Sequence, residues 1–269
     1  MTSPAVSLPM YDFPEIRAAT DAVWAAIRAR LVAGGIDAPA ELDRRADHAA
    51  LWEAPDLLLS QTCGYPYVTR LRGRVRLVAT PVYRAPGCAG PRYCSTLVVR
   101  ADDPARRLGD LRGRRAAVNA GDSQSGMSAL RAAVAPLAAD GRFFGAVIAS
   151  GGHAASALAV AEGRADIAAI DCVSWAHLAA HRAPLGRGLR VLGTTAPAPA
   201  LPFVTAATRP EPEVAALRAA LADAIADPAL RPVCDALLLD GVEVLDDAAY
   251  DAITAMEDAA RHAGYPVLA

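Results

Sequence analysis

Lysine is missing from this chain of 269 residues, and all 27 of its basic residues are arginine. This absence excludes mechanisms that need a lysine side chain, namely a P-loop lysine, a kinase-type lysine and a Schiff-base lysine. The 29 acidic residues leave a net charge of only -2, so no overall field favours nucleic acid or an anionic membrane. We therefore expect no nucleic-acid partner, and we expect any bound anion to be held by local dipoles and hydroxyl groups.

Long apolar runs and closely paired cysteines are also missing. No apolar run is long enough to span a bilayer, and the first residues have neither a basic segment nor a long apolar segment, so we expect no membrane insertion and no secretory signal. The chain is then cytoplasmic, or a chain from which a signal was removed. None of the five cysteines lies in a CxxC pair, so we expect no structural zinc. We also expect no cofactor.

The residues that are present favour an α/β protein. Apolar strands and helical patterns alternate regularly after Arg100, which predicts a parallel, doubly wound sheet. The expected strands are 115–118, 146–149, 167–170 and 189–192, and the expected helices are 125–137, 154–162 and 173–180.

The C-terminal part of the chain has a different pattern. A proline-rich link at 197–202 precedes a strand at 203–206, and helices near 214–226, 229–239 and 247–263 follow with no strand between them. Such helices most simply pack back on the N-terminal region. We therefore predict two α/β lobes, the first from residues 1–98 plus 195–269 and the second from 99–194, with crossings near Val98–Arg100 and Gly193–Thr195.

One stretch, Val118–Leu130, has the pattern of a binding turn. A strand enters it, a helix leaves it, and Asp122 or Ser123 is placed to cap that helix. The N–H groups of Ser125, Gly126 and Met127 would lie at the positive end of the helix dipole, where an anion binds. The hydroxyl groups of Ser123 and Ser125 add donors. An ordinary capped turn without a ligand explains the same pattern.

Other polar residues follow or flank expected strand ends, and ligands of open α/β sheets bind at the carboxyl ends of strands. His153 can donate a hydrogen bond in either charge state, and Asp171 can accept one from a protonated oxygen. Alternatively, His153 caps its own helix and Asp171 caps the next. The candidate ligand-binding residues are Tyr11, Gln61, Thr62, Tyr93, Ser95, Ser123, Gln124, Ser125, Gly126, His153 and Asp171.

Ser125, His153 and Asp171 are also the ingredients of a hydrolytic triad. The serine lacks a Gly-x-Ser-x-Gly elbow, however, and the acid follows the histidine instead of preceding it. A cytoplasmic α/β hydrolase or transferase that uses Ser125 and His153 is therefore the alternative from another class of protein, and we expect no catalytic residues and no enzyme.

Five segments, in their order and spacing, make the chain similar to the substrate-binding component of phosphate/phosphite/phosphonate ABC transporters. They are Ser7–Asp12, Gln61–Pro66, Gly87–Tyr93, Asp122–Met127 and Ala169–Val173. The resemblance implies a type II periplasmic-binding-protein fold, with two doubly wound α/β lobes joined by two crossing segments and the ligand in the cleft between them.

The resemblance also implies a site and a partner. The phosphorus oxyanion lies on the helix N-terminus that matches Ser123 to Gly126, and His153 and Tyr93 match family positions. The implied function is to bind a phosphonate, phosphite or phosphate without catalysis, as a periplasmic monomer that serves an ABC permease. A binder of another small solute, such as a sulfonate or a pyrimidine, is the alternative within binding proteins.

Two cysteines flank a Gly/Pro loop in the N-terminal half. Cys88 and Cys94 are separated by a segment that contains Gly90-Pro91, which favours a turn. In an oxidising compartment we predict a disulfide between them, with free thiols as the alternative.

Overall fold

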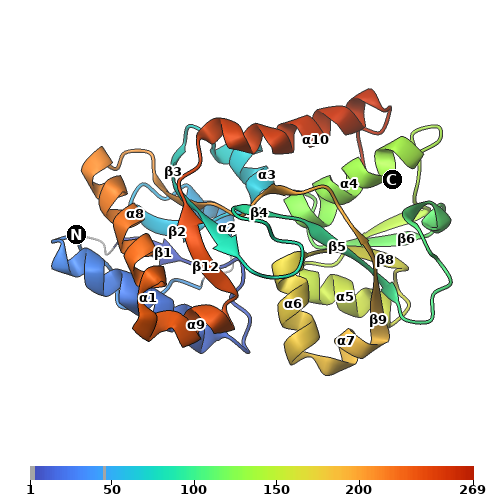
Figure 1. Ribbon diagram of the computed structural model, residues 1–269. Helices are drawn as coiled ribbons and strands as arrows, with labels where there is room; N and C mark the ends of the chain where they lie inside the picture. The colour runs from blue at the N-terminus through green and yellow to red at the C-terminus, as the bar shows by residue number, and fades with distance from the viewer. Residues whose placement is uncertain (1–3, 45–46) are drawn as a thin grey trace. The chain divides into compact units, whose positions relative to one another are not determined.

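The structure is a computed structural model that describes residues 4–44 and 47–269. The chain divides into two compact units, each assembled from separate stretches of sequence, and Figure 1 labels their elements. The first unit comprises Met1–Arg84, Ala89–Pro91 and Pro199–Ala249, and the second comprises Ala85–Cys88, Arg92–Ala198 and Tyr250–Ala269.

The first unit is built on a mixed sheet in the order β1-β2-β11-β3-β12. β1 and β2 are parallel, whereas the other neighbouring strands are antiparallel. Every residue of β2 and β11 is buried, as expected of apolar strands inside a covered sheet. The strands are β1 (Ala5–Ser7), β2 (Leu57–Gln61), β3 (Val75–Tyr83), β11 (Phe203–Ala206) and β12 (Leu239–Glu243).

Helices of the first unit pack on this sheet and on one another. In α1 the residues Val23, Trp24, Ile27 and Leu31 are buried, and this spacing lines one helical face. α8 contacts β3 and β12, and α1 packs on α8 and α9. The helices are α1 (Arg17–Ala33), α2 (His48–Trp52), α3 (Gly64–Pro66), α8 (Glu211–Ala226) and α9 (Arg231–Ala236), with a π-helical turn at Tyr67–Leu71 and 3-10 turns at Pro228–Leu230 and Asp247–Tyr250.

The second unit contains another sheet, in the order β7-β6-β8-β5-β9. β6 is parallel to β7 and β8, and β5 is antiparallel to both β8 and β9. The four strands predicted after Arg100 therefore run in one direction, and β5, which lies between β8 and β9, makes the sheet mixed. β5 precedes the regular βα units and is not linked to β8 by a βαβ crossover, so its direction is not fixed by one. The strands are β5 (Ser95–Arg100), β6 (Arg115–Val118), β7 (Ala146–Ala149), β8 (Ile167–Asp171) and β9 (Leu189–Thr194).

Helices follow the strands of the second unit as the alternating pattern predicts. The helix expected at 125–137 is divided into a π-helical turn η3 (Gln124–Ser128), α4 (Ala129–Val134) and a 3-10 turn at Ala135–Leu137. The other helices are α5 (His153–Ala161), α6 (Cys172–His181), α7 (Ala183–Gly188) and α10 (Asp251–His262), with a 3-10 turn at Leu108–Leu111. A two-stranded ladder pairs β4 (Arg92–Tyr93) with β10 (Ala198–Pro199).

One strand lies between two predicted helices, where the sequence predicted no strand. The helix expected at 229–239 ends as α9 at Ala236, and Leu238 has a φ of 55°, which stops a right-handed helix. The chain then pairs β12 antiparallel with β3. The prediction of helices without intervening strands is therefore wrong, because the leucine run before Asp240 fits a helical face as well as a strand.

The last helix groups with the second unit, whereas we predicted residues 195–269 to belong to the first lobe. The carboxylate of Glu257 on α10 lies 3.7 Å from the guanidinium of Arg131 on α4. The N–H groups of Phe143 and Phe144 both donate to the carbonyl oxygen of Ala269. These contacts join segments more than a hundred residues apart, and the periodicity of the sequence carries no information about such pairs.

The boundaries between the units also differ from the predicted crossings. β5 contains the first expected crossing and β9 ends within the second, and these two strands are neighbours inside the second sheet. The chain instead passes between units within residues 84–92, at Ala198–Pro199 and at Ala249–Tyr250.

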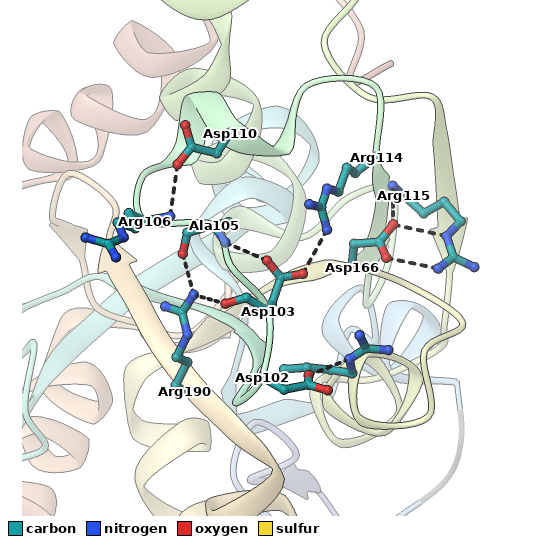
Figure 2. A network of polar contacts seen from close by, with 10 residues as sticks. Asp102, Asp103, Ala105, Arg106, Asp110, Arg114, Arg115, Asp166 and Arg190 are labelled. Carbon is teal, nitrogen blue, oxygen red and sulfur yellow. Dashed lines mark hydrogen bonds and ion pairs between the residues drawn. The ribbon is translucent and has the colours of Figure 1, made fainter.

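A network of arginines and aspartates fixes the start of β6 in the second unit (Figure 2). The Asp103 carboxylate accepts a hydrogen bond from Arg114 at 2.8 Å, and Arg190 of β9 donates to the Asp103 carbonyl at 2.7 Å. Arg115 donates through two nitrogens to both carboxylate oxygens of Asp166, which lowers the pKa of Asp166. The network holds the end of β6 opposite to Val118.

Candidate functional site

Three parallel strands of the second unit end at one edge of its sheet. Val118 at the end of β6 pairs with Ala149 at the end of β7, and β6 is also parallel to β8, which ends at Asp171. The turns that leave these strands therefore start close together. They carry the predicted residues Ser123 to Gly126, His153 and Asp171.

Ser123 shapes the turn that follows β6. It is the N-cap of η3, and its Oγ accepts a hydrogen bond of 2.9 Å from the N–H of Gly126. The Ser123 carbonyl accepts from the N–H groups of Met127 and Ser128, at 3.3 and 2.9 Å. This bonding produces a π-helical turn, a conformation that is frequent at functional sites.

The N–H groups that we predicted for an anion are only partly available. Those of Gly126 and Met127 donate to Ser123, as described, whereas the N–H of Ser125 makes no hydrogen bond among residues 4–44 and 47–269. A Cβ atom at Gly126 would lie 1.8 Å from Oδ1 of Asn119. Glycine at this position therefore lets the Asn119 side chain lie against the turn.

The Ser125 hydroxyl and the His153 imidazole are in contact, with Oγ 2.9 Å from Nε2. Burial lowers the pKa of His153 to about 4, so the ring is neutral at pH 7. Nδ1 is buried and has no partner in the described part of the chain. A proton on Nε2 leaves Nδ1 as an unpaired acceptor, which costs less than an unpaired N–H.

This tautomer has a consequence for Ser125. When Nε2–H donates to Oγ, the serine hydroxyl hydrogen is free to donate to a ligand. His153 is the first residue of α5, after the N-cap Gly152, and its ring reaches Ser125. The alternative in which His153 caps its own helix therefore does not hold.

Ser95 supports the turn from the neighbouring strand. Its hydroxyl donates to the carbonyl oxygen of Ser125 at 2.8 Å, and its N–H donates to Oγ1 of Thr195 at 2.9 Å. Ser95 is 1% exposed. The geometry therefore gives Ser95 the role of positioning Ser125.

Asp171 caps α6, which was the alternative considered from the sequence. Its Oδ1 accepts from the N–H groups of Val173 and Ser174, at 2.8 and 3.0 Å. It also lies opposite Ser95 in the pairing of β5 with β8. His153 has no bond to Asp171 among the described residues, so Ser125, His153 and Asp171 do not form the geometry of a triad.

Part of the predicted set lines one recess of the second unit. The space inside it is smaller than a water molecule, so an anion would bind at its mouth or displace side chains. Tyr93 groups here and not with the first lobe, where we expected it. The lining residues are Tyr93, Cys94, Ser95, Gln124, Ser125, Ala129, Thr195, Ala196 and Ala198.

The other three predicted residues, Tyr11, Gln61 and Thr62, lie in the first unit. The Tyr11 ring packs edge-on against Tyr83 with 5.1 Å between centroids, and Gln61 Nε2 donates to the Tyr83 hydroxyl at 3.3 Å. The Thr62 hydroxyl donates to the carbonyl of Cys63 at 3.3 Å. Tyr11 and Gln61 are thus brought together through Tyr83, and their binding role stays a prediction.

Sequence reasoning missed Asn119 and Thr195. Asn119 follows β6 directly and Thr195 follows β9 directly, so both carried the signal of a polar residue at a strand end. Asn119 belongs to the stretch that we analysed, but its amide was not recognised as filling the space at Gly126. Thr195 was predicted to lie in a crossing between the lobes, so it was not considered as a partner of Ser95.

The described residues meet neither the requirements of a metal site nor those of a membrane-spanning helix. Within residues 4–44 and 47–269, no group of three or more His, Cys, Asp or Glu side chains is arranged to hold a metal ion. Over the same residues, no helix combines the length and the hydropathy needed to cross a bilayer.

Comparison with solved structures defines the class of fold. The chain has the two-lobed α/β fold of periplasmic binding proteins, with a mixed sheet in each unit. Residues 8–250 match the family model described as ABC transporter, phosphonate, periplasmic substrate-binding protein. This match covers most of the chain, and the chain belongs to that family of non-enzymatic substrate-binding proteins.

Three solved structures illustrate the likeness. A binding protein component of an ABC phosphonate transporter (PA3383) from Pseudomonas aeruginosa is 17% identical, with a TM-score of 0.76, over 98% of this chain and 88% of that chain. PhnD1 from Prochlorococcus marinus (MIT 9301), in complex with methylphosphonate, is 14% identical, with a TM-score of 0.75, over 96% and 98%. XAC2383 from Xanthomonas citri, bound to ATP, is 17% identical, with a TM-score of 0.70, over 98% of both chains.

At these identities the likeness to solved structures concerns the fold and not the ligand. A sequence search of curated proteins found no match.

Proposed function

We propose that this chain binds a small phosphorus oxyanion, namely a phosphonate, phosphite or phosphate, at the turn Ser123–Gly126 of the second unit. The observation that carries the proposal is the Ser125 group: a hydroxyl held 2.9 Å from a neutral His153 and an N–H that makes no hydrogen bond in the described chain. Both groups can donate to oxyanion oxygens at the start of a helix.

The ligands of two similar proteins support the choice of phosphorus. Methylphosphonate occupies PhnD1 and ATP occupies XAC2383, and both ligands present phosphorus–oxygen groups. Gln124 stands between the two serines of the turn, Ser123 and Ser125, and has a larger side chain than either. Gln124 is 1% exposed and lines the recess. Its larger side chain is therefore a candidate for setting ligand size.

The remaining predicted residues belong to the same proposal. Tyr11, Gln61, Thr62 and Tyr93 are proposed to contribute hydroxyl and amide groups to the ligand. The donors named here are neutral at pH 7, so the proposed selectivity rests on hydrogen-bond geometry and not on a charged clamp. Asp171, whose carboxylate can accept from a protonated oxygen, is proposed to favour an oxyanion that retains a proton.

Calorimetric titration with a matched set of ligands tests the proposal. Methylphosphonate and methanesulfonate have similar shapes, but the sulfonate has no protonated oxygen near neutral pH. We expect methylphosphonate, phosphite or phosphate to bind at least tenfold more tightly than methanesulfonate or a pyrimidine. Preferred binding of the sulfonate or the pyrimidine would instead assign the chain to the alternative class of solute.

We also propose that the chain is a periplasmic monomer that delivers its ligand to an ABC permease, because the family model describes such a component. A permease complex reconstituted in vesicles provides the test. The liganded chain should raise the rate of ATP hydrolysis by a phosphonate permease, and equal stimulation by the chain without ligand would contradict delivery.

A further inference from the structure

Three cysteine thiols of the second unit lie close together beside the predicted ligand-binding residues. Sγ of Cys88 is 3.4 Å from Sγ of Cys172. The N–H of Cys172 donates to the carbonyl of Cys94 at 3.1 Å, and the N–H of Cys94 donates to the carbonyl of Gly87 at 3.1 Å. Backbone hydrogen bonds therefore hold together the three segments that carry these thiols.

Gly87 permits this close approach. Its φ is +102°, a left-handed conformation that glycine adopts without strain. A Cβ atom at this position would lie 2.7 Å from Sγ of Cys94 and 3.1 Å from Cβ of Cys172. Any larger residue would push this loop away from the other two thiols, so the loop brings Cys88 to Cys172.

We propose that Cys88 and Cys172 are a reversible redox pair that closes to a disulfide, with Cys88 as the thiol that meets the oxidant. Cys88 is half-buried, whereas Cys172 is 1% exposed. A small disulfide compound therefore reaches Cys88 first. The pair predicted from sequence spacing, Cys88 with Cys94, is not the pair of sulfur atoms that hydrogen bond in the structure.

The oxidant is a low-molecular-weight disulfide, and the reaction is two thiol–disulfide exchanges. The Cys88 thiolate attacks one sulfur of the reagent, forms a mixed disulfide and releases one thiolate. The Cys172 thiolate then attacks Sγ of Cys88, the mixed disulfide breaks, and the second reagent thiolate leaves. The reagent disulfide is reduced to two thiols, the protein pair is oxidised, and the protons of both cysteines pass to the released thiolates.

Thiol acidity separates the roles within the cluster. Burial raises the pKa of Cys94 to about 11, so Cys94 is a poor nucleophile at neutral pH. The hydrogen bond with Cys88 and burial raise the pKa of Cys172. The second exchange is therefore the slow step, and closure should accelerate as the pH rises.

Closure would tie the Gly87–Cys88 loop to the start of α6. Cys172 follows Asp171, which caps that helix, and Cys94 lies between Tyr93 and Ser95. The disulfide would thus form next to several predicted ligand-binding residues. The proposal does not depend on the identity of the ligand.

Alkylation and peptide mass spectrometry test the pair. The purified full chain is equilibrated in buffers with increasing ratios of oxidised to reduced glutathione, unfolded in denaturant that contains iodoacetamide so that every free thiol is alkylated, and digested. We expect Cys88 and Cys172 to lose alkylation together and to yield one linked peptide, while Cys63, Cys94 and Cys234 stay alkylated. Dithiothreitol should restore both sites, and the melting temperature should be higher for the oxidised protein.

Variants separate this pair from the alternatives. Cys88→Ser should leave Cys172 alkylated in every buffer, whereas Cys94→Ser should still form the linked peptide. Cys63→Ser is the matched control, because Cys63 lies in the first unit, and it should behave as the unmodified chain does. A peptide linking Cys88 to Cys94, or alkylation of all five thiols in the most oxidising buffer, would overturn the proposal. Both outcomes are measured on the unmodified chain, so they do not depend on the folding of a variant.

Discussion

Ser125 is held on two sides, because His153 Nε2 contacts its hydroxyl oxygen and the Ser95 hydroxyl donates to its backbone carbonyl. Substituting Ser125 by Ala should remove one donor to a charged acceptor and leave the turn intact. Such a bond is worth roughly 1.5–3 kcal/mol, so the dissociation constant for the best oxyanion should rise about 10- to 150-fold.

Calorimetry measures this change in affinity. Thr69→Ala is a matched control, since it removes an exposed hydroxyl that donates within the first unit. An unchanged dissociation constant for Ser125→Ala, with the control also unchanged, would remove Ser125 from the site.

His153 predicts a pH dependence of folding. Its pKa falls from the ordinary value of 6.5 to about 4 because of burial. Between these values the unfolded chain binds the proton more readily than the folded chain does. The stability that depends on neutral His153 is therefore complete above pH 6.5 and lost as the pH falls toward 4, by about 3 kcal/mol.

Denaturant unfolding at several pH values checks this prediction. Carboxylates also titrate in the same range, so the quantity to compare is the difference between the unmodified chain and His153→Gln. We expect that difference to change in favour of the variant as the pH falls from 6.5 to 4. Parallel curves for the two proteins would contradict a buried, neutral His153.

At the scale of elements, the contact between α10 and α4 depends on a buried ion pair. Arg131 is 5% exposed and Glu257 is 9% exposed, and Arg131 also donates to the carbonyl of Pro266. Glu257→Ala should leave the Arg131 charge buried without its partner and lower the free energy of unfolding by roughly 3–5 kcal/mol.

Thermal and denaturant unfolding give the measurement. Asp258→Ala is the control on the same helix, because Asp258 is exposed, and it should change stability by less than about 0.5 kcal/mol. Equal stability of both variants would mean that α10 is not anchored through Glu257.

Local pattern predicted most elements of this fold and failed at specific places. β6, the turn after it and α5 follow from apolar runs, a capping serine and helical spacing. β12 could not be recognised, because Asp240 and Gly241 interrupt its apolar residues and the leucines before them fit a helix equally well. The direction of β5 in its sheet depends on non-local pairing, which periodicity does not encode.

The site shows the same division between local and non-local information. The Ser123 cap was predictable, because capping depends on residues three positions apart. The bonds from Ser125 to His153 and from Ser95 to Ser125 join residues 28 and 30 positions apart. The sequence shows that these residues can form hydrogen bonds, but it does not show which residue bonds to which. The Cys88 and Cys172 contact spans 84 positions and was missed for this reason.

At the scale of the whole molecule, the predicted site draws residues from both units. Tyr11, Gln61 and Thr62 belong to the first, and Ser123, Ser125 and His153 belong to the second. A ligand that contacts both groups stabilises the conformation in which all contacts are made. We therefore predict that the best oxyanion decreases the radius of gyration.

Small-angle scattering with and without that ligand provides the measurement. Ser125→Ala at the same ligand concentration is the control, and it should show a smaller decrease because less ligand is bound. An unchanged radius of gyration under saturating ligand would contradict the prediction that residues of both units share one anion.

The placement of α10 in the second unit sets the order in which the chain can fold during its synthesis. Residues 85–198 leave the ribosome long before Tyr250–Ala269, and the whole Pro199–Ala249 stretch of the first unit is made in between. Until then Arg131 has no Glu257, and the N–H groups of Phe143 and Phe144 have no Ala269 carbonyl. All residues of the first unit are therefore synthesised before α10, and the second unit can be completed only after the last helix has been made.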